Sequence, residues 1–513
     1  MHILDWISVG KVSAERDDLL SSYFFDNGVL KSVIGSPSSF LVLGRKGAGK
    51  TAVFKYLKEN TQEFIDNEDI LVPLSFEDYN WNIHAILTNE SKAESMLYKQ
   101  SWRFVILIEC VKAYHQWFKS KGIAMPKRLG IAMKLLEKLF DSPVPSIYQI
   151  VGRKLLSLSS LKLPGGGIDI EDGGIDSLNI DAGEITFDQV KADKGLRQHL
   201  SENIENLISY LDRALAESGN AWPRVFICFD RVDEAWDEVS YESSRKVIAG
   251  LVSACDAINS QYKGVVRPVV FLREDIFDVL SINDANKLRE DCGALLHWNK
   301  ASLGSMILRR VNHFGKQHGV PLIMDLDSMF DKAEMRQRAR PSNYLLRRTM
   351  MRPRDLISLL NRVIETMREK CDDPFADEPI VFEKLECESI YGAEPGYSEW
   401  LKQELLDEWK VQRPIIEDLF HALQNNGATN FSQVALAEEL KKLIGDVSNA
   451  DMLSHLRFLF DNSIIGFKLG ASHEWRFKCF YPSQGFLESD EYRVHEGLVR
   501  ALNLTETRDR EDA

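Results

Sequence analysis

Four apolar runs of the kind found in buried strands are spread along this chain. They occupy residues 39–43, 69–74, 224–229 and 267–272. Each run is short, mostly apolar and followed by polar residues, which is typical of strands covered on both faces in a parallel sheet. Segments with helical patterns lie between the runs. The chain is therefore predicted to contain an α/β core in which strands and helices alternate.

Between the second and third runs the pattern changes to long amphipathic helices. Residues 92–161 and 196–217 carry helical periodicity and predict a mainly helical insertion. The Gly- and Asp-rich segment 165–180 alternates Ile and Leu around Asp-Gly-Gly, which favours an acidic hairpin. A calcium site is the less favoured interpretation, because the spacing of an EF-hand is absent.

Beyond the fourth run the chain predicts further helices and a second small domain. Residues 303–314 and 356–367 have helical periodicity, and residues 371–410 are acidic and rich in turn signals, which suggests a linker with one helix. Three helical patterns between residues 415 and 460 precede two strand-like runs, as in a winged helix. The polar segment after Glu488 predicts a frayed tail.

The first apolar run leads directly into a Gly-rich sequence that is typical of phosphate binding. It reads Gly44-Arg45-Lys46-Gly47-Ala48-Gly49-Lys50-Thr51-Ala52, and a helix-forming run follows. The glycines allow backbone N–H groups to surround phosphate oxygens at the start of a helix. Lys50 is expected to reach the β- and γ-phosphates, and the Thr51 hydroxyl to ligate Mg²⁺. The sequence predicts a site for a nucleoside triphosphate.

The third apolar run ends in acidic residues that suit the same chemistry. Asp230 follows the hydrophobic residues 225–229, and Asp233 and Glu234 come three and four residues later. A carboxylate at the end of a strand can hold Mg²⁺ through its water shell, and a second can accept a proton from an attacking water. Both Asp233 and Glu234 are candidates for this base. We favour Glu234 because its side chain is longer.

Two arginines are candidates for contact with the γ-phosphate. The fourth run delivers Arg273, which either senses this phosphate or pairs with Glu274 or Asp275 at the surface. Arg354 belongs to the sequence Arg352-Pro353-Arg354-Asp355, at the predicted start of a helix. It either points from a helical lid toward the nucleotide or is an exposed arginine of a capped helix. The pair Arg309-Arg310 favours a solvated basic face over a catalytic arginine finger.

Charge and composition narrow the choice of partners. The 513 residues require several domains, and the net charge of −14 argues against broad, non-specific binding of nucleic acid. Residues 411–486 hold seven basic and eight acidic residues, so a role in contact with proteins or between domains is favoured over DNA binding. The seven cysteines lie far apart and show no zinc spacing, as expected of reduced thiols in the cytoplasm. No apolar run is long enough to span a membrane.

These parts together resemble the AAA+/STAND division of P-loop ATPases, which includes Cdc6-like, NACHT and KAP ATPases. The loop from Gly44 to Ala52 is similar to that of a bacterial ATPase family with a G-R-K-G-[SA]-G-K-T-A sequence. The resemblance extends to Arg273 and to the Arg352-Pro353-Arg354-Asp355 segment. It implies a strand-end sensor role for Arg273 and a lid-sensor role for Arg354. It also implies a molecular switch, of a kind often encoded beside nucleases in anti-phage defence.

The prediction is an α/β P-loop NTPase core with a large mainly helical insertion, a helical lid and a C-terminal winged helix. The expected function is a switch ATPase that binds and slowly hydrolyses ATP with Mg²⁺, and that controls its own assembly or a partner effector such as a nuclease. A DNA-binding initiator or remodelling ATPase is the alternative. The expected parts are a lead-in with the P-loop half of the core (1–75), the insertion (76–220), the second half of the core (221–300), the lid (301–370), a linker (371–410), the winged helix (411–486) and a tail (487–513).

Overall fold

The computed structural model describes residues 2–76, 94–140, 194–216, 222–235, 241–372, 380–470 and 474–506. The chain divides into two compact units. One contains Met1–Asn27, Lys46–Ala52 and His297–Ala513, and the other contains Gly28–Arg45 and Val53–Leu296. Each has its own hydrophobic core. We call the first the lid unit and the second the sheet unit.

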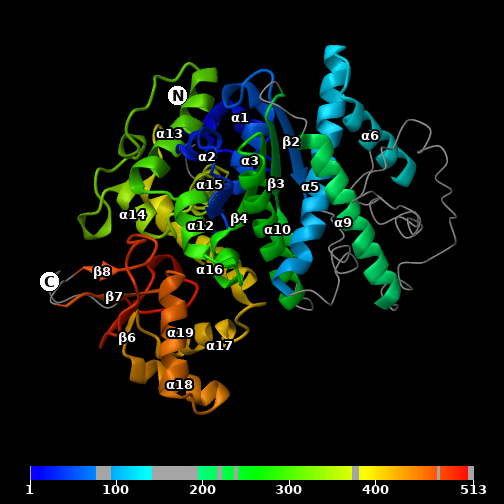
Figure 1. Ribbon diagram of the computed structural model, residues 1–513. Helices are drawn as coiled ribbons and strands as arrows, with labels where there is room; N and C mark the ends of the chain where they lie inside the picture. The colour runs from blue at the N-terminus through cyan, green and yellow to red at the C-terminus, as the bar shows by residue number, and fades with distance from the viewer. Residues whose placement is uncertain are drawn as a thin grey trace. The chain divides into compact units, whose positions relative to one another are not determined.

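The sheet unit is built on a five-stranded parallel sheet (Figure 1). Its strands are β1 (Leu41–Gly44), β2 (Ile70–Ser75), β3 (Val225–Asp230), β4 (Val266–Arg273) and β5 (Gly293–Leu295), in the order β2-β3-β4-β1-β5. The four predicted strands are confirmed, and β5 is a short addition. β1, β3 and β4 are buried along their whole length, which explains their continuous hydrophobicity. In this order, β4 lies between the strand of the Gly-rich loop and the strand that ends in Asp230.

The helices of this unit pack on the sheet or on one another. They are α2 (Val29–Gly35), α3 (Lys50–Glu59, which begins in the loop), α5 (Glu94–Lys121), α6 (Lys127–Phe140), α9 (Lys194–Ala216), α10 (Tyr241–Gln261), α11 (Glu274–Val279) and α12 (Ala285–Cys292). α10 packs against both β4 and α5, and α9 packs against α5 and α6. The indole of Trp102 on α5 donates to the carbonyl oxygen of Val247 on α10 at 2.9 Å. The predicted helical insertion is confirmed for its described residues, whereas the predicted acidic hairpin at 165–180 lies outside them.

One polar residue interrupts the apolar pattern of β4. The guanidinium of Arg267 donates to the carbonyl oxygens of Ile34 and Val33, at 2.5 and 2.7 Å, in the last turn of α2. These carbonyls have no partner within the helix, so a buried cation satisfies them. Burial lowers the pKa of Arg267 to about 10. Its place in the strand is therefore explained by the helix that it caps.

The lid unit has a helical core of α13 (Lys300–Gln317), α14 (Pro341–Arg347), α15 (Pro353–Cys371) and α16 (Cys387–Trp409). α15 packs against α13, α14 and α16. Pro353 occupies the first turn of α15, as predicted, and the apolar face that begins at Leu356 is buried. The short α1 (Leu20–Tyr23) packs against α13, so the N-terminal residues belong to this unit.

One expectation about the lid unit is wrong for one of its two residues. Arg309 is exposed as predicted, but Arg310 does not lie on a solvated basic face: it is 7% exposed, its Nη1 donates to the carbonyl oxygen of Val9 at 2.8 Å, and Asp17 lies 3.4 Å away. The segment 371–410, predicted as a linker with one helix, contains the long helix α16, with Pro395 in its interior. The buried contacts of Tyr397, Leu401 and Leu405 hold the residues around Pro395 helical in spite of their turn signals.

The C-terminal part of the lid unit combines three helices with a small sheet. The helices are α17 (Ile416–Asn426), α18 (Gln433–Ile444) and α19 (Asn449–Asp461), and α17 and α18 end at Gly427 and Gly445, as the sequence indicates. The strands are β6 (Asn430–Phe431), β7 (Ile465–Lys468), β8 (Trp475–Arg476) and β9 (Tyr492–Val494), in the order β6-β9-β7-β8. The three helices and the β7–β8 pair are as predicted; the designation as a winged helix stays a prediction.

The expectation of a frayed tail after Glu488 is wrong for the described residues up to Glu506. β9 pairs with both β6 and β7, and Tyr492, His495 and Leu498 are fully buried. Apolar and polar residues alternate around Tyr492, which indicates a strand. The prediction missed this pattern because the segment as a whole is polar. Of the helices described, none combines the length and the apolar character required to cross a bilayer.

Candidate functional site

The backbone of the Gly-rich loop has the conformation expected for phosphate binding. β1 ends at Gly44 and α3 begins at Lys50, which confirms the strand–loop–helix context. Gly47 and Gly49 have φ angles of 81° and 100°. Such left-handed values are accessible to glycine at little cost, and they turn successive N–H groups toward one side of the chain. The local geometry therefore fits an anion at the N-terminus of α3.

Three side chains of the lid unit hold this loop from outside. The indole nitrogen of Trp298 donates to the carbonyl oxygen of Ala48 at 2.8 Å, and Arg352 donates to that of Lys46 at 3.0 Å. Arg354 packs on Gly47 so closely that a Cβ there would lie 2.7 Å from its Nε. Gly47 is thus required by this close approach as well as by its φ angle. Trp298 could not be selected from the sequence, because no recognisable motif surrounds it.

Arg354 also faces a carboxylate of α16. An oxygen of Glu404 lies 2.6 Å from Nη1 of Arg354 and 3.9 Å from the ammonium nitrogen of Lys46. Within the described part of the chain, Nε and Nη2 of Arg354 are buried without a hydrogen-bond partner. Two donors of this guanidinium thus remain available to an acceptor. Sequence reasoning missed Glu404 because it lies in the segment predicted as a linker.

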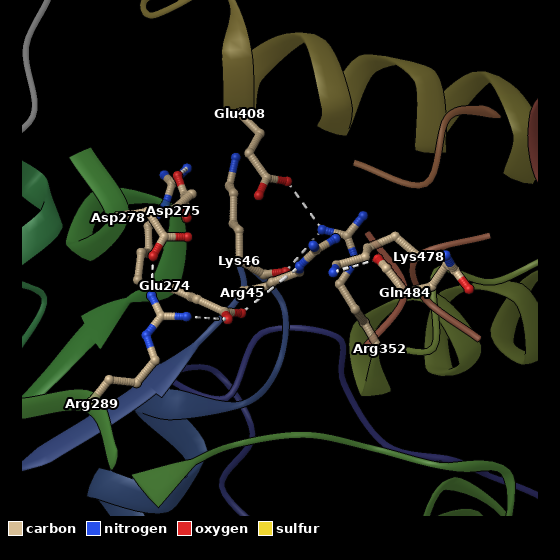
Figure 2. A network of polar contacts seen from close by, with 11 residues as sticks. Arg45, Lys46, Glu274, Asp275, Asp278, Arg289, Arg352, Glu408, Lys478 and Gln484 are labelled. Carbon is tan, nitrogen blue, oxygen red and sulfur yellow. Dashed lines mark hydrogen bonds and ion pairs between the residues drawn. The ribbon is translucent and has the colours of Figure 1, made fainter. Parts of the chain in front are cut away.

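The start of α15 is fixed by a buried ionic network (Figure 2). Arg352 lies 3.1 Å from a carboxylate oxygen of Asp355 and 3.0 Å from one of Glu408, and all three residues are buried. Burial disfavours the charge of Arg352, but the two carboxylates outweigh this effect and raise its pKa. Arg352 is therefore a positioning residue that ties α15 and α16 to the loop.

In the sheet unit, two candidate residues end adjacent strands. Gly44 at the end of β1 is the register partner of Arg273 at the end of β4, and Asp230 ends β3. Asp230 is 2% exposed. Arg273 is 8% exposed and donates to Asp275 at 2.7 and 3.2 Å. The predicted strand-end position of Arg273 is confirmed and so is a pairing with Asp275, but the pair is buried instead of lying at the surface.

The two candidates for the base lie just after β3, in the 3₁₀ turn Val232–Ala235. Asp233 is half-buried. The side chain of Glu234 is not among those that the structure describes. The choice between them stays a prediction. No cluster of three or more His, Cys, Asp or Glu residues suited to a metal occurs in the described ranges. A magnesium ion bound with ATP does not need such a cluster, because phosphate and water oxygens complete its shell.

Arg45 takes part in a separate network on the sheet unit (Figure 2). Its Nε lies 4.0 Å from Glu274, which also accepts from Arg289 at 3.4 Å. Glu274 begins α11 directly after Arg273. Of the predicted loop residues, Arg45 thus has a carboxylate partner in the sheet unit, whereas Lys46 has one in the lid unit.

The parallel sheet with a phosphate-binding loop after β1 gives the chain the α/β fold of P-loop NTPases. Residues 301–406 match a family model described as the FunZ-associated C-terminal helical domain. This range covers α13 to nearly the end of α16.

Two individual proteins are similar to the chain. It is 25% identical over 368 residues to the putative transposon gamma-delta 80.3 kDa protein of Escherichia coli K12, which covers 69% of this chain and 46% of that protein. The chain thus spans about half the length of this relative. The crystal structure of Cdc6p from Pyrobaculum aerophilum is similar over 95% of this chain and 97% of that one, with 10% identity and a TM-score of 0.32.

Proposed function

We propose that the protein is a switch ATPase of the AAA+/STAND type that binds and hydrolyses ATP. The observation that carries the proposal is the arrangement of the sheet. The G-x-x-x-x-G-K-T loop follows β1, while Asp230 and Arg273 end β3 and β4. This combination of a phosphate-binding loop, a strand-end carboxylate and a strand-end cation suits phosphoryl transfer.

Each candidate residue has a role in this proposal. The N–H groups of the loop and Lys50 bind the phosphates, and Thr51 with Asp230 hold Mg²⁺. When bound, the metal neutralises charge on the β- and γ-phosphate oxygens. Glu234, or Asp233 in its place, orients the attacking water and accepts its proton. Arg273 and Arg354 recognise the γ-phosphate.

The lid contacts support a role as a switch. Arg352, Arg354 and Trp298 all touch the loop, so a change in the loop on binding ATP alters the lid directly. We infer that nucleotide state controls homo-oligomer assembly or the binding of an effector protein. The resemblance of the loop to anti-phage ATPases supports a nuclease as effector and a role in defence.

Calorimetric titration of the full chain with ATP and Mg²⁺ tests the proposal. Lys50→Ala should abolish tight binding, because it removes the cation that neutralises the β- and γ-phosphates. Lys58→Ala is the matched control, since Lys58 is an exposed lysine at the end of the same helix. Equal ATP affinity in the Lys50 variant and the wild type would disprove the assignment of the loop.

A further inference from the structure

A short arginine-rich loop departs from the acidic character of the chain. Between Lys332 and Arg348 there are six basic residues and one acidic residue, although the whole chain has a net charge of −14. The loop proper is the 3₁₀ turn Arg336–Arg338 with the two residues that follow it. We call residues 336–340 the arginine loop.

The arginine loop is attached to its neighbours by hydrogen bonds, and its arginines are exposed. The N–H of Met335 donates to the carbonyl oxygen of Ala339 at 2.8 Å, and the N–H of Arg336 donates to the hydroxyl of Tyr391 at 3.0 Å. The Arg336 guanidinium lies 4.2 Å from the centre of the Tyr391 ring. Gln337 and Arg338 both have left-handed backbones, with φ of 60° and 52°. Such strain is found preferentially at functional sites.

Among the residues that the structure describes, the charges of this loop have no acidic counterparts. Arg336, Arg338 and Arg340 are all exposed, and within the described ranges none of them forms an ion pair with a carboxylate. The neighbouring Arg347 and Arg348, in contrast, both pair with Glu496. The acidic residues described thus leave these three cations to an external partner.

The arginine loop adjoins a cavity lined by aromatic rings. The cavity has a volume of about 800 Å³. Gln337 lies on its wall, so the loop forms part of its rim. Its lining combines the aromatic residues Trp475, Phe480 and Tyr481 with three cations and two carboxylates. The cations are Lys300, Arg347 and Arg493, and the carboxylates are Glu474 and Glu496, the latter paired with Arg347. A smaller cavity shares Gln337 and Arg493 with it and adds Arg336 and Arg500.

We propose that the arginine loop and this aromatic cavity form a binding surface for single-stranded nucleic acid. The exposed guanidinium groups would bind successive phosphates, and a base would enter the cavity and stack on the half-buried Trp475 or Tyr481. A purely acidic peptide such as polyglutamate supplies negative charge but no planar ring for the cavity. A duplex supplies phosphates but keeps its bases stacked inside. The combination of charge and rings therefore favours a single strand.

This inference revises the expectation drawn from the charge of residues 411–486. That segment is near neutral. The arginines of the arginine loop lie outside it, 71 or more residues earlier in the chain. This proposal does not rest on the proposed ATPase activity, because the binding surface requires no bound ATP.

The test is fluorescence anisotropy with the full chain and labelled 20-nucleotide probes, without ATP. The probes are oligo(dT), oligo(U) and a DNA duplex, with polyglutamate as competitor. Arg338→Ala/Arg340→Ala should weaken single-strand binding at least tenfold. It should also reduce the slope of log K against log salt by about 1.4, since each phosphate contact on a single strand contributes about 0.7. The tighter of the two single strands identifies the preferred sugar.

Two further variants separate stacking from charge. Trp475→Leu should weaken binding by about five- to hundredfold and leave the salt slope unchanged, and Trp475→Phe should restore most of the affinity. Lys441→Glu/Lys442→Glu, on the exposed face of α18, is the matched control and should bind as the wild type does. Circular dichroism verifies that each variant is folded.

Several results would overturn the proposal. These are the absence of binding to both single strands at 50 mM salt, tighter binding of the duplex, or competition by polyglutamate at equal charge concentration. Unchanged affinity in the double arginine variant, or equal loss in the lysine control, would also show that the arginine loop is not the binding surface.

Discussion

A carboxylate oxygen of Glu404 lies 2.6 Å from the guanidinium of Arg354, on the side chain that packs against Gly47 of the phosphate-binding loop. The same oxygen lies 3.9 Å from Lys46. The negative charge of Glu404 therefore lies beside Arg354 and Lys46, two cations that are candidates to bind phosphate. In the proposed function, a γ-phosphate must compete with Glu404 for Arg354.

Glu404→Gln should therefore bind ATP more tightly than the wild type. The substitution keeps the size of the side chain and removes the charge that competes with phosphate. Because the pair is partly solvated, we expect about a fivefold gain, or roughly 1 kcal/mol. Calorimetry with ATP and Mg²⁺ measures it. Glu399→Gln is the control, since Glu399 lies on α16 and pairs with Lys402 instead. Weaker ATP binding in Glu404→Gln would mean that Glu404 positions Arg354 and does not compete for it.

The catalytic base can be identified by comparing Glu234→Gln with Asp233→Asn. If Glu234 accepts the proton of the attacking water, Glu234→Gln should bind ATP normally and hydrolyse it at least tenfold more slowly, because general bases contribute about a hundredfold or more. Phosphate release under single-turnover conditions measures the rate. Full activity of Glu234→Gln together with an inactive Asp233→Asn would assign the role to Asp233.

Nucleotide state should control association, and two arginines should transmit it. ATP that engages both Arg273 and Arg354 would couple the sheet to α15, and hydrolysis would remove that link. Each charge-assisted contact is worth about 1.5–3 kcal/mol, so Arg273→Ala and Arg354→Ala should each abolish the response while ADP still binds. Mass photometry with an ATP analogue, ADP and no nucleotide gives the readout, alone and with a candidate partner. Identical mass distributions of the wild type in all three states, and no nucleotide-dependent partner binding, would refute the switch.

The sheet and its loop could be predicted because their signals are local. Continuous apolar runs identify β1 to β4, and the sequence from Gly44 to Thr51 encodes its own backbone conformation. The end of each strand follows from the same pattern, so Asp230 and Arg273 could be selected before the sheet order was known. Parallel pairing then brings strand ends to one edge.

The contacts around the loop could not be predicted because they join distant segments. Trp298 is 250 residues from Ala48, and Arg352 is 306 residues from Lys46. Glu404 and Glu408 were not selected because Pro395 lies a few residues before them, and proline usually breaks a helix. Here packing against α15 keeps α16 helical in spite of Pro395. Similarly, the polar composition after Glu488 concealed a strand whose few apolar residues all point into the core.

A buried, uncharged histidine, His495, directly follows strand β9. His495 is fully buried, its Nδ1 accepts from the N–H of Gly497 at 3.1 Å, and its ring stacks on Phe480 with centroids 5.7 Å apart. Burial, reinforced by the nearby Arg348, lowers the pKa of His495 from 6.5 to about 3. The folded protein thus keeps this ring neutral at pH values where the unfolded chain protonates it.

This difference predicts a loss of stability in mild acid. Well above pH 6.5 the ring is neutral in both states, so His495 causes no pH dependence there. As the pH falls from 6.5 toward 3, the unfolded chain binds a proton that the folded one does not, and the free energy of unfolding decreases. Between pH 7 and pH 5 the decrease from this residue is about 2 kcal/mol. The His495→Asn variant keeps a hydrogen-bond acceptor near the position of Nδ1 but has no titrating ring. Its free energy of unfolding should therefore fall by about 2 kcal/mol less than that of the wild type between pH 7 and pH 5, whatever its stability at pH 7. Urea unfolding at both pH values measures it, with His318→Asn, at an exposed histidine, as the control. If His495→Asn and the wild type lose equal stability between pH 7 and pH 5, the buried ring is not held neutral.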